Sequence, residues 1–177
     1  MNSKYATPSI ALHWLMLLLL AAVYACMELR GLFPKGSAVR EGMKTWHYML
    51  GLSVFVLAWL RLGVSFFGTI PAIVPAAPPW QRRFSGFMKI ALHAVMLGMP
   101  VLGWFLLSAE AKPIPFFGLH LPALIGESPD FADQIKDVHE SVGTLGYVLI
   151  GLHAAAALYH HYIAGDNTLR RMLPFKD

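Results

Sequence analysis

Four apolar stretches, each close to the length that crosses a lipid bilayer, constrain the fold of this chain more than any other feature. They cover residues 10–27, 46–67, 87–108 and 142–164 of the 177. About 20 predominantly apolar residues suffice for a membrane-spanning helix, and a helix satisfies its own backbone hydrogen bonds in hydrocarbon. The sequence therefore predicts an all-α, integral membrane four-helix bundle, which residues 1–177 form as a single domain.

The composition agrees with a membrane protein and excludes several kinds of site. Hydrophobic residues make up 56% of the chain and charged residues 14%, and the mean hydropathy is +0.54, more apolar than an ordinary soluble domain. The single cysteine, Cys26, excludes intramolecular disulfides, thiolate-ligated iron–sulfur clusters and covalently attached c-type haem. The first stretch continues into Glu28 and Arg30 without a small-residue cleavage site, so we expect a retained span rather than a signal peptide.

The distribution of lysine and arginine predicts how the bundle is oriented. When the loops are assigned to alternate sides, eight cations lie at one end and six at the other. The larger group is Lys4, Arg61, Arg82, Arg83, Lys89, Arg170, Arg171 and Lys176, and the smaller is Arg30, Lys35, Arg40, Lys44, Lys112 and Lys136. Cytoplasmic loops carry the excess of positive charge, so both termini are expected in the cytoplasm. No basic run is interleaved with aromatic residues in a polar segment, so we expect no nucleic-acid partner.

Prolines mark the connections between the stretches. Thr7 and Pro8 predict a helix N-cap and the first residue after it, and four prolines within 68–85 predict an extended loop. Residues 113–122, inside the longer loop 110–137, are apolar but too broken by proline to span a membrane, so we expect a lid over the outer end of the bundle. Pro100, inside the third stretch, predicts a kink.

Histidines inside the apolar stretches are the main functional signal, because polar rings are expensive in hydrocarbon. His139 and His153 are fourteen positions apart, which places them on one face of a helix, roughly 21 Å apart along its axis. His47 and His139 both lie near the outer ends of helices that run from the outer to the inner side, so they can face each other and bind one metal. His13 lies near the inner end of its helix, and spacing alone leaves its partner open between His153 and His160.

Histidine pairs from facing helices commonly hold haem iron inside a bundle. Gly51, Gly143 and Gly146 lie within two turns of the outer histidines and clear the face against which a porphyrin would pack, although membrane helices also use glycine for close packing. Arg61 can meet a haem propionate or extend to the inner interface. A zinc or iron transporter is disfavoured, because the interiors of the first three stretches contain no carboxylate. We expect structural roles for two further histidines. His93 should form a helix–helix hydrogen bond, and His120 should be part of the lid.

The chain resembles the bacterial cytochrome b561 family of four-helix dihaem membrane proteins. The resemblance is carried by the motifs IALHW at 10–14, WH at 46–47, PIPFFGLHL at 113–121, LH at 152–153, YHHY at 159–162 and NTLRRMLP at 167–174. It implies two b-type haems in a bacterial inner membrane protein, with His47 and His139 on the outer haem and His13 and His153 on the inner one. This assignment leaves His160 free for another role.

Within that family the chain is most similar to small free-standing members that oxidise superoxide and reduce ubiquinone, through MELRGLFP at 27–34 and DNTL at 166–169. The third stretch departs from the family, with Lys89 where relatives often carry histidine and His93 where they often carry tyrosine, so nothing is carried over there. The resemblance implies superoxide and ubiquinone as substrates and no obligatory protein partner. The alternative is a haem-bearing membrane anchor that relays electrons for a separate hydrogenase or dehydrogenase subunit.

Quinone reduction requires protons as well as electrons, and His160 is the expected catalytic proton donor, since histidine titrates near neutral pH. The competing role for His160 is an anchor at headgroup level. Four outer cations are candidates for a positive path that attracts superoxide, although rim cations are usually only solvated. They are Arg30, Lys44, Lys112 and Lys136.

Overall fold

The computed structural model describes residues 4–174, and four long helices make up most of that range. They are α1 (Thr7–Leu29), α2 (Ala38–Phe67), α3 (Pro79–Ala109) and α4 (Pro129–Tyr162). All four are long and apolar enough to cross a membrane. The prediction of an all-α membrane four-helix bundle is therefore confirmed.

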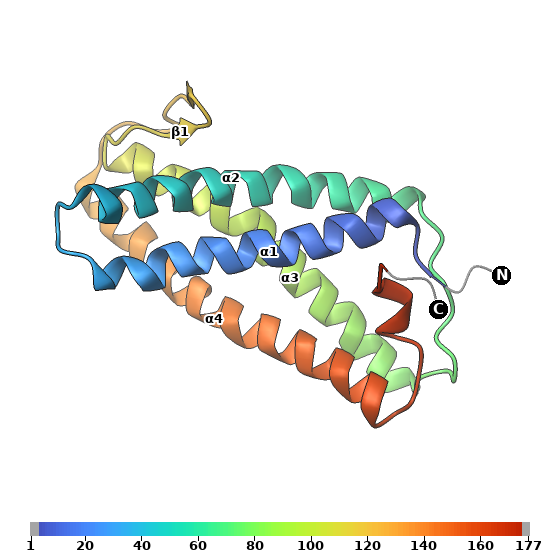
Figure 1. The fold of residues 1–177 in the computed structure, drawn as a ribbon. Coiled ribbons are helices and arrows are strands. Elements are labelled where there is room, and N and C mark those ends of the chain that lie inside the picture. Colours follow the sequence, from blue (N-terminus) through green and yellow to red (C-terminus); the bar gives the residue numbers. More distant parts are fainter. Residues whose placement is uncertain (1–3, 175–177) are drawn as a thin grey trace.

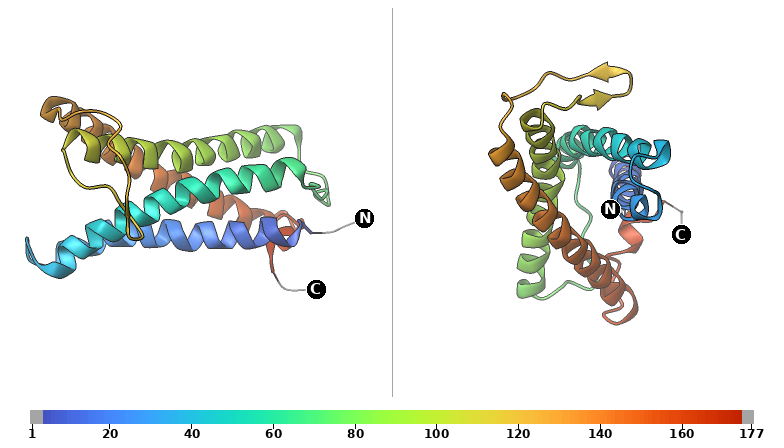
Figure 2. Two further views of the ribbon diagram at one scale, coloured as in Figure 1. Left: turned by 90° about the horizontal axis from the view of Figure 1, so that it is seen from above. Right: turned by 90° about the vertical axis from the view of Figure 1, so that its left-hand side faces the viewer.

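The helices follow one another in antiparallel order, so that each packs against its neighbour in the chain (Figure 1). The pair of α3 and α4 is inclined to the pair of α1 and α2. Both ends of the described chain lie at the same end of the bundle (Figure 2), which we call the inner end; the opposite one is the outer end. A buried apolar cluster of Met16, Val54, Ala58 and Met96 joins the first three helices in the middle of the bundle.

The helices extend beyond the apolar stretches that predicted them. α2 begins at Ala38, where the Ser37 hydroxyl accepts a hydrogen bond from the Arg40 N–H, and α4 begins at Pro129 rather than at residue 142. Hydropathy marks only the part of a helix that fits hydrocarbon, whereas caps and an early proline mark where a helix begins. The predicted loops 68–85 and 110–137 are therefore too long, and the N-cap of α1 is Ala6 rather than Thr7.

The segment after α3 forms a short hairpin instead of an irregular lid. Strands β1 (Pro115–Phe116) and β2 (Leu119–His120) pair antiparallel. The intervening Phe117 and Gly118 have φ of 45° and 87°, the positive values that a tight two-residue turn requires. The Phe117 ring lies 6.3 Å from that of Trp46 on α2. The hairpin thus packs beside α2 and does not cross the middle of the bundle in the end-on view of Figure 2, so the expected lid over the outer end is wrong.

The inner end is closed by the segment that follows α4, which contains the one-turn helix η2 (Arg170–Met172). The Asn167 side chain accepts a hydrogen bond from the Val74 N–H at 2.9 Å and donates to the Ala72 carbonyl at 3.2 Å. The Trp14 indole N–H donates to the Met172 carbonyl at 2.7 Å. This segment therefore fastens the α2–α3 connection and the start of α1 to each other.

α3 continues through Pro100 without interruption. The other one-turn helix, η1 (Arg30–Leu32), follows α1 at the outer end. There the Arg40 guanidinium donates to the carbonyls of Arg30 and Phe33. These bonds join the segment that follows α1 to the first turn of α2, and they fix the turn between the two helices.

Candidate functional site

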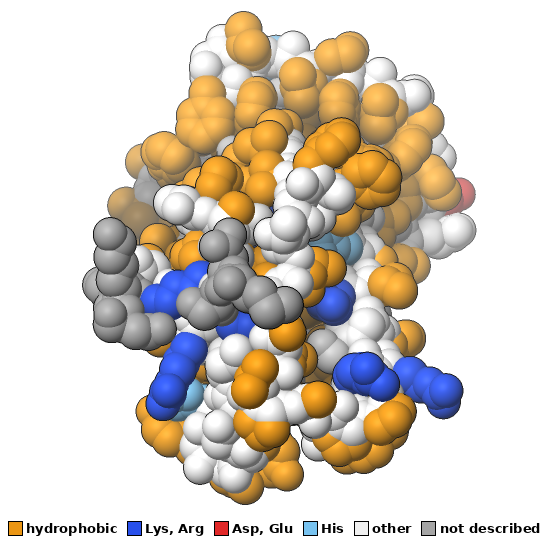
Figure 3. Space-filling model, turned by 90° about the vertical axis from the view of Figure 1, so that its right-hand side faces the viewer, with side chains coloured by type: hydrophobic (Ala, Val, Ile, Leu, Met, Phe, Trp, Pro, Cys, Tyr) orange, Lys and Arg blue, Asp and Glu red, His pale blue; other side chains and the backbone are white. Residues whose placement is uncertain are grey.

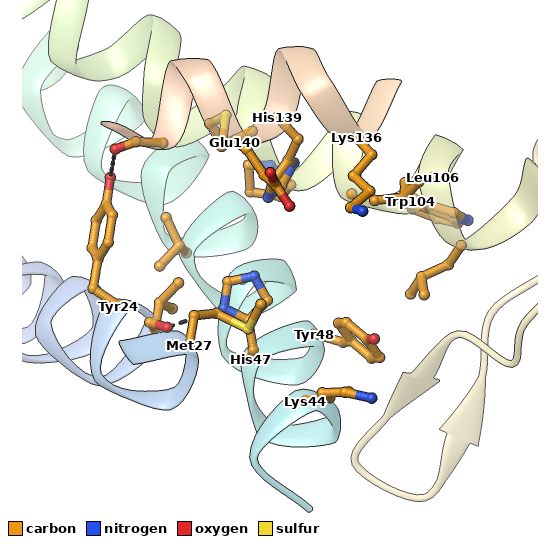
Figure 4. Close-up of a pocket in the computed structure, with 18 of the residues that line it drawn as sticks. Tyr24, Met27, Lys44, His47, Tyr48, Trp104, Leu106, Lys136, His139 and Glu140 are labelled. Carbon is orange, nitrogen blue, oxygen red and sulfur yellow. Dashed lines mark hydrogen bonds between the residues drawn. The ribbon is translucent and has the colours of Figure 1, made fainter. Parts of the chain in front are cut away.

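The outer histidine pair faces inward from α2 and α4. The ring centroids of His47 and His139 are 6.3 Å apart and the rings are inclined by 71°, and Figure 4 shows both rings pointing into one cavity. His47 Nδ1 lies 3.0 Å from the Val23 carbonyl oxygen. Because a carbonyl can only accept, Nδ1 carries the proton and Nε2 is left as the electron-pair donor. His139 Nδ1 is buried without a hydrogen-bond partner.

The inner pair joins α1 and α4. The ring centroids of His13 and His153 are 6.1 Å apart, with the planes inclined by 76°. The Arg61 guanidinium, from α2, donates to His13 Nδ1 at 2.9 Å. His160, the other partner that spacing allowed, is instead bonded to Asp166. The geometry therefore favours His153 over His160 as the partner of His13.

Both ring separations fit a metal ion held between two imidazoles. A metal–imidazole bond is about 2 Å, and adding about 1 Å from each nitrogen to its ring centroid places two rings in line about 6 Å apart. In residues 4–174 no group of three or more His, Cys, Asp and Glu side chains could hold a metal ion. A bare ion would lack ligands here, whereas a porphyrin supplies the remaining ligands itself, so the residues present fit haem.

One contact must change for the inner pair to ligate iron through Nε2. A neutral imidazole bound through Nε2 carries its proton on Nδ1, yet Arg61 can only donate to that atom. The guanidinium must then turn away from His13 and needs another acceptor. A haem propionate is such an acceptor, in keeping with the role expected for Arg61.

The outer pair lies in a cavity of about 760 Å³ lined by all four helices, a size typical of cofactor sites. Gly51 and Gly143 line it, and a Cβ on Gly51 would meet no atom within 4 Å. A Cβ on Gly146, in contrast, would lie 2.1 Å from the Tyr24 hydroxyl oxygen. Gly146 thus makes room for Tyr24, and the expectation that it clears a porphyrin face is not what the structure shows.

Tyr24, which the sequence analysis missed, connects α1 to α4 across this cavity. Its hydroxyl donates to the Gly143 carbonyl at 2.9 Å, as the dashed line at the upper left of Figure 4 shows. Its ring packs 4.3 Å from that of Tyr147, whose hydroxyl donates to Glu28 at 2.7 Å. No spacing rule relates positions 24 and 143, so only the folded structure reveals this link.

All four cations expected on the path to the outer pair line the cavity, namely Arg30, Lys44, Lys112 and Lys136. Two of them are paired, Lys44 with Glu41 and Lys112 with Glu110, each at 2.9 Å. The hydrogen bond to Glu110 raises the pKa of the Lys112 ammonium. Lys136 points inward from α4 (Figure 4) and forms no ion pair with any other described residue. Arg30 forms none with the described residues either, so Lys136 and Arg30 are the cations most available to an incoming anion.

His160 lies apart from both pairs, at the inner end of α4. Its Nδ1 is 2.5 Å from Asp166 Oδ2, and the Asp166 carboxyl is almost fully buried. Burial raises the pKa of Asp166, but hydrogen bonds from Thr168 and His160 outweigh it and hold that pKa below its usual value. Asp166 was missed as a site residue, although it follows His160 closely in the sequence.

The two remaining predicted histidines have local roles. His93 Nδ1 lies 2.7 Å from the Lys89 carbonyl of its own helix, so the expected bond to another helix is not formed by this nitrogen. His120 is an exposed residue of β2, in the hairpin beside α2. Neither contributes to the two facing pairs.

Comparison with known proteins identifies the family of this chain. A sequence model described as prokaryotic cytochrome b561 matches residues 4–175. The chain is 41% identical over 172 residues to cytochrome b561 homolog 1 of Escherichia coli (strain K12), covering 97% of this chain and 98% of the relative. It is 34% identical over 176 residues to a Yersinia pestis protein named probable superoxide oxidase CybB, covering 99% of each. The chain therefore belongs to the prokaryotic cytochrome b561 family of membrane electron-transfer proteins.

Proposed function

We propose that this cytochrome binds two b-type haems, one between His47 and His139 and one between His13 and His153, and that it oxidises superoxide and reduces ubiquinone. The observation that carries the proposal is the pair of ring separations, 6.3 Å and 6.1 Å, at two depths of one bundle. The name of the Yersinia pestis relative supports the choice of superoxide. When bound between two histidines, haem supplies one-electron transfer with no open position on the iron.

The overall reaction fixes what the chain must provide. Two superoxide ions each lose one electron and become two molecules of dioxygen. One ubiquinone gains those two electrons and two protons and becomes ubiquinol. The protein must therefore attract an anion at one site and deliver protons at another.

Anion attraction is assigned to the outer cavity. Its rim holds both cations and carboxylates, so it is not uniformly positive. We assign the attraction to Lys136 and Arg30, which form no ion pair with the described residues. A cation inside a water-filled cleft with apolar walls raises the local concentration of an approaching anion.

Proton delivery is assigned to His160 at the inner end. The Asp166 carboxylate accepts from Nδ1, which fixes the tautomer of the ring and leaves Nε2 to exchange a proton with quinone. The His160 side chain is 17% exposed, so it can recover a proton from solvent. A histidine that only anchors the helix would have no need of a buried carboxylate partner.

Stopped-flow kinetics on His160→Ala test this assignment. The variant should retain both haems and be reduced by superoxide like the wild type, yet be reoxidised by ubiquinone about 100-fold more slowly, the usual contribution of a general acid. His161→Ala is the matched control, because the neighbouring ring has no hydrogen bond to Asp166. An unchanged rate with quinone in His160→Ala would make this residue an anchor only.

We also place the inner end in the cytoplasm of a bacterial inner membrane. Figure 3 shows Lys and Arg side chains spread over this end, whereas Asp and Glu side chains are visible only at its edge. This charge distribution supports cytoplasmic termini. A reporter that fluoresces only in the cytoplasm, fused after residue 177, should be bright.

A further inference from the structure

Two arginines at the inner end, the buried Arg171 and the half-buried Arg61, have no carboxylate partner among the described residues. Arg171 of η2 is only 6% exposed. One of its nitrogens donates to the Pro71 carbonyl, and its Nε is buried with no partner. Within residues 4–174, neither Arg171 nor Arg61 forms an ion pair with an aspartate or glutamate. Burial of an unpaired charge is costly, so a neutralising anion is expected beside them.

Arg61 contacts the inner histidine pair, and Arg171 lies in the segment that packs against the same end of α1. Arg61 contacts His13 directly, at 2.9 Å. Arg171 is followed by Met172, whose carbonyl accepts from Trp14, the neighbour of His13. The Arg171 backbone carbonyl also accepts from the Tyr5 N–H, and its guanidinium lies 5.5 Å from the centre of the Tyr5 ring. The segment that closes the inner end thereby holds a second cation near the start of α1.

We propose that Arg171 and Arg61 together bind the propionate carboxylates of the inner haem, an inference that rests on the proposed haem between His13 and His153. Arginine binds carboxylate through paired N–H groups, and the unpartnered Nε gives Arg171 a free donor for this purpose. Arg61 becomes available when it leaves His13 Nδ1. The role of Arg171 is thus distinct from that of Arg170, which is adjacent in sequence but exposed.

The reduction potential of the inner haem tests this assignment, since a cation beside a propionate favours the reduced iron. Spectroelectrochemical titration of full-length Arg171→Gln should show the inner potential shifted to lower values and the outer one unchanged. Arg171→Lys retains the charge and should remain close to the wild type, and Arg170→Gln should not differ from it. Equal potentials in Arg171→Gln and the wild type would overturn the proposal.

A second measurement separates carboxylate binding from the structural role of the closing segment. The apoproteins are reconstituted with haem and with haem dimethyl ester, in which both propionates are blocked. Arg171→Gln should weaken inner-site binding of haem but not of the ester. Equal weakening for both would show that Arg171 only supports the fold, and would overturn the proposal.

Lipid phosphate is the other oxyanion available at this end. The potential shift in Arg171→Gln should therefore be the same in phospholipid-free detergent and in phosphatidylglycerol nanodiscs. A shift confined to the nanodiscs would assign the guanidinium to lipid and overturn the proposal. If the wild type bound no haem between His13 and His153, the proposed function itself would fail, which is a separate outcome.

Discussion

The contact between Tyr24 on α1 and Gly146 on α4 predicts that Gly146→Ala destabilises the fold, because the added methyl group would collide with the Tyr24 hydroxyl. A Cβ at position 146 would lie 2.1 Å from the Tyr24 hydroxyl oxygen, so Tyr24 must turn away and lose its bond to Gly143. The lost hydrogen bond is worth about 1 kcal/mol, and forced repacking costs about 1–3 kcal/mol. The helix propensity gained over glycine offsets about 1 kcal/mol. We expect a net loss of about 1–3 kcal/mol in the free energy of unfolding.

Removing the Tyr24 hydroxyl should abolish or reverse this destabilisation. In Tyr24→Phe the hydrogen bond is already lost, and the nearest ring atom lies 3.4 Å from the position that the alanine methyl group would occupy, an ordinary contact. Gly146→Ala should then be neutral, or stabilising by up to about 1 kcal/mol, in the Tyr24→Phe background. Gly151→Ala is the matched control on the same helix, because a Cβ there meets nothing within 4 Å.

Denaturant unfolding in mixed micelles, followed by circular dichroism, measures the four variants of this cycle. The coupling between positions 24 and 146 is the difference between the effects of Gly146→Ala in the two backgrounds. If Gly146→Ala has the same effect with and without the Tyr24 hydroxyl, or is no worse than Gly151→Ala, the packing account of Gly146 is wrong.

Three further predictions concern the two ends of the bundle. Lys136→Gln should lower the rate of reduction by superoxide and weaken its dependence on ionic strength, as measured by pulse radiolysis at several salt concentrations; an unchanged salt dependence would argue against steering by this side chain. Gly51→Ala should leave the fold intact, because the added Cβ meets no atom within 4 Å, but weaken outer-haem retention in a spectroscopic titration; unaltered retention would remove Gly51 from the haem face. The pKa of Asp166 in the folded state is below its ordinary value near 3.8, so the ionised carboxylate stabilises the fold at pH values above 3.8. This contribution is lost as the pH falls through the lower, folded-state pKa. The difference in unfolding temperature between wild type and Asp166→Asn should therefore shrink below about pH 4, and a difference that persists there would contradict this.

The bundle and the facing histidines could be predicted because each rests on a local property of the sequence. Apolar length gives the number of spans, and the position of a histidine within its span gives its depth. Depth alone could not choose between His153 and His160, since both lie on one helix face. The choice depends on where the chain turns after α4, because that turn brings Asp166 to His160 and leaves His153 opposite His13.

Other features could not be predicted because they depend on how distant side chains meet. Tyr24 and Gly146 are related only through the crossing of α1 and α4. Arg171 was counted as one of several inner cations, whereas the closing segment buries it against Pro71 and Tyr5. The start of α4 was missed for a different reason. Residues 129–141 are helical, but they are too polar to belong to the apolar stretch that begins at residue 142.

Haem content per polypeptide tests the central claim most directly. The purified wild type should contain two b-type haems by pyridine haemochrome assay against quantitative amino-acid analysis. His139→Ala and His153→Ala should each contain one, with the lost haem being the outer one in the first variant and the inner one in the second. A wild-type content of one haem or none would contradict the account, and so would loss of the inner haem in His160→Ala but not in His153→Ala.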